Sequence, residues 1–90
     1  MPEAADPPKS AADVNALMEQ GLAAEKGGRM GEAVRFYKQA SAAGSGIAAK
    51  RLGDIYGKGS DGVPRSYQES LRYLEIARAR GVDVPKTVSK

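Results

Sequence analysis

Two segments of the chain match each other at an offset of 37 residues, and both end in glycine. Each carries, at the spacing of one helix face, a small residue, an aromatic residue, an apolar residue, Ala and a final Gly. The matched positions are Met30 and Tyr67, Glu32 and Glu69, Ala33 and Ser70, Phe36 and Tyr73, Tyr37 and Leu74, Ala40 and Ala77, and Gly44 and Gly81. A repeat of this length is typical of a solenoid, because one helix pair cannot bury its apolar face alone. We therefore expect an all-α fold of two antiparallel helix pairs, stacked as a short right-handed α-solenoid.

Apolar spacing and the positions of Gly and Pro predict four helices and two tails. The helices are expected from Ser10 to the Gly27-Gly28 pair, from about Met30 to Ala43, from about Gly46 to Tyr56, and from Ser66 to Gly81. An acidic residue three positions after Ser10 and after Ser66 makes each serine an expected N-cap. The units are a disordered tail or linker over 1–9, helix pairs over 10–44 and 45–81, and an irregular tail over 82–90.

The repeat also predicts which residues fill the interior. Small residues should let the two helices of a pair approach closely: Gly21, Ala33, Ala40, Gly53, Ser70 and Ala77. Large residues on the inward faces are expected to form the core between the pairs: Tyr37, Leu52, Tyr56, Tyr67, Leu71 and Leu74. In the turn 57–64, Gly59 and Gly62 are expected to hold backbone angles that other residues resist.

The second unit carries a recognisable pattern. It reads GSGIAAKRLGDIYGKG over residues 44–59 and GVPRSYQESLRYLEIARARG over residues 62–81. This closely resembles a Sel1-like repeat, a branch of the tetratricopeptide-repeat superfamily. The turn between Gly59 and Gly62 is one residue longer than usual, Ser70 replaces the usual Ala, and Leu74 replaces the second aromatic residue. The first unit is more similar to an ordinary tetratricopeptide repeat, and the resemblance covers about residues 13–81.

Composition argues against catalysis. The chain has no Cys and no His, which excludes disulfides, Cys-based zinc sites and thiol nucleophiles and removes the commonest general base. The serine hydroxyls therefore have no His to activate them, and the glycines around Lys58 lack the order of a phosphate-binding loop. We expect no enzyme activity, no catalytic residues, no metal and no cofactor.

No apolar run reaches the roughly 20 residues that span a bilayer. The Pro-rich, acidic N-terminus is unlike a signal peptide, so the cytoplasm is the default compartment. The periplasm is the alternative if this domain was excised from a longer protein.

Charge is distributed unevenly along the chain. Residues 1–45 carry five basic and six acidic side chains, and residues 46–90 carry nine basic and five acidic ones. Clustered basic residues favour nucleic acid, because they release counterions from phosphates. Here acidic residues interleave with the basic ones, which is also typical of a solvated helix face. A small basic nucleic-acid-binding domain is therefore kept as an alternative.

The family resemblance implies a concave face lined by the first helix of each pair. The candidate partner-binding residues are Asn15, Met18, Leu22, Lys26, Ile47, Lys50, Arg51, Asp54 and Lys58, with Glu25 beside them. Lys50 and Arg51 would bind a carboxylate of the partner, and Met18 and Leu22 would supply an apolar patch. The alternative is that Met18 and Leu22 pack under the N-terminal tail while the charges are merely solvated.

The expected function is a non-enzymatic protein–protein interaction module, an adaptor or scaffold that binds a protein or peptide partner. Self-association is a further option. The Ala-, Gly- and Arg-rich composition fits a GC-rich bacterial genome. A regulatory or assembly subunit of an enzyme, or of a secretion or cell-envelope complex, is the second alternative, beside the nucleic-acid-binding domain.

Overall fold

The computed structural model describes residues 11–60 and 62–82. It contains four helices: α1 (Ala11–Lys26), α2 (Met30–Ala42), α3 (Gly46–Lys58) and α4 (Tyr67–Ala79). No strand occurs among the described residues, so the prediction of an all-helical chain with four helices is confirmed. The third helix continues to Lys58, two residues beyond its expected end. The expected cap at Ser10, the tail 1–9 and nearly all of the tail 82–90 lie outside the described residues.

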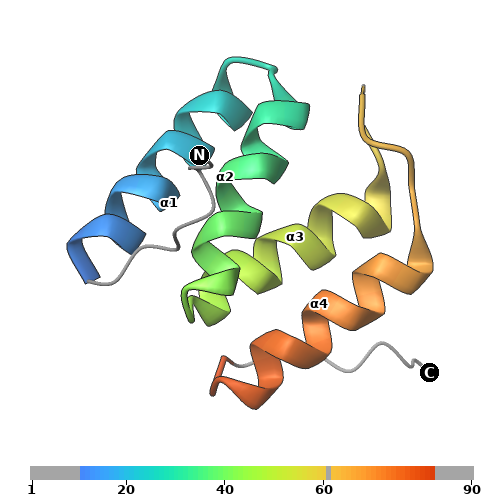
Figure 1. The fold of residues 1–90 in the computed structure, drawn as a ribbon. Coiled ribbons are helices and arrows are strands. Elements are labelled where there is room, and N and C mark those ends of the chain that lie inside the picture. The colour runs from blue at the N-terminus through green and yellow to red at the C-terminus, as the bar shows by residue number, and fades with distance from the viewer. Residues whose placement is uncertain (1–10, 61, 83–90) are drawn as a thin grey trace, which may run out of the picture.

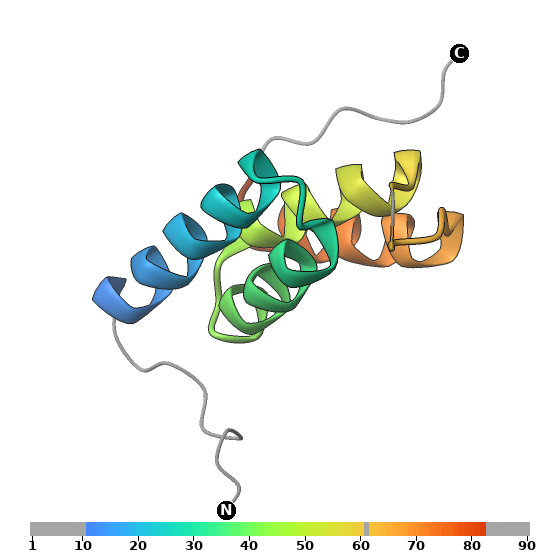
Figure 2. The ribbon, with the colours of Figure 1, turned by 90° about the horizontal axis from the view of Figure 1, so that it is seen from above.

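The helices form two antiparallel hairpins that lie side by side (Figures 1 and 2). Within the hairpins α1 packs against α2 and α3 against α4, and the contact of α2 with α3 joins the hairpins. The first hairpin turns within residues 27–29, whereas residues 59–66 connect α3 to α4.

Three of the four helices end in the same way. A glycine with positive φ follows α1, α2 and α4, namely Gly28, Gly44 and Gly81. In each case the N–H of the next residue donates to the carbonyl of a buried alanine five positions earlier, at 2.8–3.0 Å; these alanines are Ala24, Ala40 and Ala77. This Schellman arrangement satisfies carbonyls that the helix itself leaves unpaired. The Ala and Gly positions that the sequence repeat matched therefore have the same structural role.

Within each hairpin, the two helices approach each other closely at a glycine of the first helix. A Cβ placed at Gly21 would lie 2.5 Å from the Tyr37 ring, and one at Gly53 would lie 2.6 Å from Leu74. Tyr37 and Leu74 are matched positions of the repeat, so each first helix presents a glycine to the same position of its second helix. Ser70 adds a hydrogen bond of 2.7 Å from its hydroxyl to the Gly53 carbonyl. Close approach of the helices at small residues is therefore confirmed.

Only part of the expected core is confirmed. Tyr37 and Leu52 are fully buried, and Tyr56 and Leu74 are partly buried. Tyr67 and Leu71 are 66% and 51% exposed, so placing them in the core was wrong. The physical reason is the rotation of α4, which turns Ser70 and Ala77 inward and leaves no described element over Tyr67 and Leu71. The prediction also omitted buried residues, namely Val34, Ile55 and Val63.

The connection between α3 and α4 is closed by local hydrogen bonds. Gly59 and Gly62 have φ of 75° and 81°, which confirms their expected backbone angles. Ser60 and Val63 exchange backbone hydrogen bonds of 2.8 and 2.9 Å, and Val63 is buried. Ser66 caps α4 by accepting from the Glu69 N–H, while its own N–H donates to the Tyr56 carbonyl. The cap at Ser66 is therefore confirmed. In a capping box the Glu69 side chain would accept from the Ser66 N–H, but here the Tyr56 carbonyl of α3 accepts from it.

Candidate functional site

Two hollows that share Glu25 and Arg51 open on the side where α1 and α3 approach each other. The larger, of about 300 Å³, is lined by Glu25, Met30, Arg51, Asp54, Ile55, Lys58, Gly59 and Ser60. The smaller, of about 270 Å³, is lined by Leu22, Glu25, Lys26 and Arg51. We call the two together the α1–α3 groove. Its lining mixes apolar side chains with charges of both signs.

Arg51 is the central charged group of the groove. Its Nη1 lies 3.9 Å from Glu25 Oε1, beyond hydrogen-bond distance. Its Nε is buried and has no hydrogen-bond partner among the described residues. A buried donor without an acceptor destabilises the fold by about 1–3 kcal/mol. The guanidinium therefore has one buried donor without a described partner, while the side chain as a whole is 40% exposed at the groove wall.

Glu25 connects the groove to the core. Its Oε1 accepts a hydrogen bond of 2.6 Å from the hydroxyl of Tyr37, whose side chain is fully buried. Burial, and then the Glu25 carboxylate, raise the pKa of the Tyr37 hydroxyl well above its usual value, while Arg51 acts in the opposite direction. Glu25 is thus held by Tyr37 and makes a long ion pair with Arg51.

Five of the nine candidate residues line the groove: Leu22, Lys26, Arg51, Asp54 and Lys58. Lys50 does not line it, and its Nζ lies 3.5 Å from Asp54 Oδ2. Met18 packs against the core and accepts a weak hydrogen bond from the Ser45 hydroxyl, with 3.8 Å between oxygen and sulfur. Asn15 and Ile47 are exposed and lie apart from the groove lining.

Four residues of the groove lining were not predicted from the sequence. Met30 and Ile55 provide apolar lining, and Gly59 and Ser60 also line the groove. The residues after Tyr56 were assigned to a turn because of their glycines, which concealed the continuation of α3 to Lys58. The apolar spacing of Ile55 on the third helix was the available signal.

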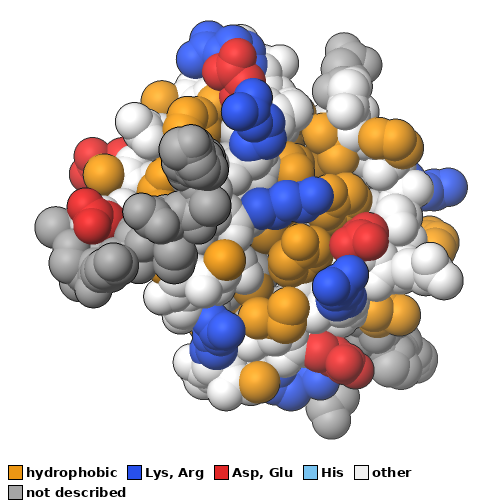
Figure 3. Space-filling view, viewed as in Figure 1, with side chains coloured by type: hydrophobic (Ala, Val, Ile, Leu, Met, Phe, Trp, Pro, Cys, Tyr) orange, Lys and Arg blue, Asp and Glu red, His pale blue; other side chains and the backbone are white. Residues whose placement is uncertain are grey.

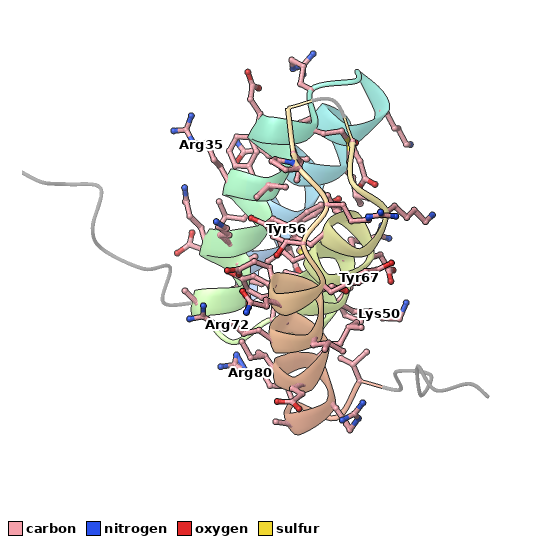
Figure 4. All side chains as sticks on the ribbon, turned by 90° about the vertical axis from the view of Figure 1, so that its right-hand side faces the viewer. Arg35, Lys50, Tyr56, Tyr67, Arg72 and Arg80 are labelled. Atoms are coloured by element: carbon pink, nitrogen blue, oxygen red, sulfur yellow. The ribbon has the colours of Figure 1, made fainter. Side chains whose placement is uncertain are left out.

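A second face carries basic side chains from α2 and from α4 and its end. Arg35, Arg72 and Arg80 extend toward one side of the molecule and Lys50 toward the other (Figure 4). Figure 3 shows Lys and Arg side chains spread among apolar ones on this face. Several are held within the protein: Arg80 donates to the Ser41 carbonyl, and Lys38 lies 5.8 Å from the centre of the Tyr56 ring. Tyr56 in turn stacks on Tyr73, with ring centres 6.0 Å apart.

Within residues 11–60 and 62–82, no group of three or more His, Cys, Asp or Glu side chains is placed to hold a metal ion. Across the same residues, no helix combines the length and the apolar character needed to cross a membrane. No family model, curated protein or solved structure matches this chain.

Proposed function

We propose that this chain is a non-enzymatic protein–protein interaction module of Sel1 or tetratricopeptide type, built as a short solenoid. Three features of the described residues support the solenoid. They are the repeated Ala–Gly helix ends, the repeated glycine contacts within each hairpin, and the lateral contact of α2 with α3. A chain of two stacked pairs offers partners an extended surface.

The α1–α3 groove is the proposed binding surface, and the observation that carries it is the partly exposed Arg51 side chain, whose guanidinium makes only a long ion pair there. A carboxylate or carbonyl oxygen from a partner would accept a hydrogen bond from this guanidinium. Lys26 and Lys58 add positive charge to the lining, against Glu25 and Asp54. Leu22, Met30 and Ile55 supply apolar area. The groove thus favours a peptide segment with an acidic residue beside an apolar one.

The test begins with selection from a random linear peptide library displayed on phage. Selected peptides should be enriched in Asp or Glu next to an apolar residue. Arg51→Gln should weaken the binding of a selected peptide at least tenfold, because hydrogen bonds to charged groups contribute about 1.5–3 kcal/mol.

Arg72→Gln is the matched control, because Arg72 Nη1 also lies 3.9 Å from a glutamate, Glu69. It lies outside the groove and should leave affinity unchanged. Equal losses in the two variants, or peptide-induced NMR shifts confined to α2 and α4, would exclude the groove as the binding surface.

A further inference from the structure

An apolar stripe on α4 is only partly covered by other described residues, among them Arg65, whose guanidinium lies 5.4 Å from the centre of the stripe's tyrosine ring. It consists of Tyr67, Leu71 and Leu74, which follow one another at helical spacing, and we call it the terminal stripe. Tyr67 and Leu71 are 66% and 51% exposed, and Leu74 is partly buried against Gly53. Large apolar side chains gathered on one side of a helix are a common mark of an interaction surface.

The repeat shows what covers such a stripe. The residues 37 positions earlier are Met30, Val34 and Tyr37 on α2. Val34 and Tyr37 are buried and Met30 is partly buried, in one cluster with residues of α3. The α3 residues in that cluster are Ala48, Leu52 and Ile55, spaced four and three positions apart. The position equivalent to the terminal stripe is thus covered by a helix that presents small and aliphatic side chains.

The chain contains a second helix of the same type whose equivalent side is exposed. Gly21 and Gly53 make matching contacts in the two hairpins and so align α1 with α3 at an offset of 32 residues. At this offset, Ala48, Leu52 and Ile55 correspond to Ala16, Gln20 and Ala23 of α1. All three α1 residues are exposed. We call them the α1 outer side.

Charge disfavours the pairing of two like ends, although α4 itself carries two basic and two acidic side chains. Helix α1 carries three carboxylates, on Asp13, Glu19 and Glu25, against one lysine. Residues 46–82, which include the second hairpin, carry seven basic and four acidic side chains. Like charges on two surfaces disfavour their pairing. A pairing of α4 with α4 of another copy would bring two net basic hairpins together.

We propose that a second copy of this chain docks the α1 outer side on the terminal stripe, repeating the way in which α3 covers α2. The contact is head-to-tail, so each copy keeps one free end of each kind and association continues beyond the dimer. It uses surfaces outside the α1–α3 groove and does not depend on the proposed peptide binding.

The test measures mass against concentration by analytical ultracentrifugation. The wild-type protein should exceed the mass of a dimer at high concentration, and added salt should weaken the association. Leu71→Arg removes one half of the contact and Ala23→Arg the other, so each variant alone should stay monomeric. Both substitutions are at exposed positions. Ala42→Arg adds the same charge at another exposed position and should still associate.

Mixing the two blocked variants distinguishes a head-to-tail contact from others. The intact α4 of the Ala23→Arg protein can pair with the intact α1 of the Leu71→Arg protein, so the mixture should form a 1:1 dimer and nothing larger. If circular dichroism shows Leu71→Arg unfolded, Tyr67→Arg replaces it. A wild-type protein that stays monomeric, a dimer unaffected by Ala23→Arg, or a mixture that stays monomeric would each overturn the proposal.

Discussion

Tyr37 joins the core and the surface of this protein in one side chain. Its ring packs against Gly21 inside the first hairpin, and its hydroxyl donates to Glu25 at the groove wall. A carboxylate that is only partly buried is thereby held in one position beside Arg51. The geometry of the groove consequently depends on a core residue, and a change at Tyr37 affects both stability and the surface.

Because of the Tyr37 hydroxyl, the free energy of unfolding also depends on pH in the alkaline range. A tyrosine in the unfolded chain ionises near 10.0, but in the folded protein the pKa of Tyr37 is higher. Above about pH 10 the unfolded state therefore loses a proton that the folded state keeps, and the free energy of unfolding falls as pH rises, by at most about 1.4 kcal/mol per pH unit. Below that pH this contribution is fully present.

Tyr37→Phe should reduce this alkaline loss and should lower stability by about 1.5–3 kcal/mol at neutral pH, because the hydrogen bond to the Glu25 carboxylate is removed. Urea unfolding followed at neutral pH and above pH ~10 measures both effects. Lys38, whose pKa is raised by its interaction with Tyr56, contributes equally to both proteins. If the free energy of unfolding fell with pH in parallel for the wild type and Tyr37→Phe, the alkaline loss would not come from Tyr37.

At the scale of helices, the glycines on α1 and α3 set how closely each pair packs. Gly21→Ala places a methyl group against the Tyr37 ring and should lower the free energy of unfolding by about 1–3 kcal/mol. Gly31→Ala is the matched control, since Gly31 is exposed within α2 and a Cβ there meets nothing within 4 Å. It should raise stability by about 0.5–1 kcal/mol through helix propensity. Thermal and urea unfolding of both variants test the difference, which a loss of stability in Gly31→Ala would contradict.

Much of this element-level structure could be predicted from the sequence, because its causes are local. Glycines end the helices, serines cap α3 and α4, and small residues recur where helices meet. The orientation of α4 could not be predicted, because Tyr67, Leu71 and Leu74 have the spacing of an inward face. That stripe differs from Val34 and Tyr37 in that none of the described helices covers Tyr67 and Leu71.

The groove was harder to predict than the helices. Arg51 and Glu25 were both placed on the groove face through the family resemblance. That the Tyr37 hydroxyl would hold Glu25 beside Arg51 depends on three helices meeting at one point. Helical periodicity specifies a face but no such three-way contact.

For the whole molecule, the contact of α2 with α3 is the joint between the hairpins, and Leu52 is fully buried there. Leu52→Ala should reduce the free energy of unfolding by about 2–5 kcal/mol, a large share of the stability of so small a protein. Leu71→Ala, at an exposed position, should change it by no more than about 0.5 kcal/mol. Urea unfolding at low protein concentration, where self-association contributes nothing, compares the two. Similar losses in both variants would contradict the assigned core.

The pairing of each helix with its neighbour in sequence also bears on how the chain folds. Contacts that are close in sequence require little loop closure, and helical proteins with such contacts fold within microseconds to milliseconds. The first hairpin contains its own turn, its own glycine contact and its own helix ends within residues 11–45. During synthesis, which adds roughly 5–20 residues per second, this hairpin has time to sample its native arrangement before α3 and α4 have been made. The second hairpin can then fold against the first, so the two hairpins fold in the order in which they are synthesised.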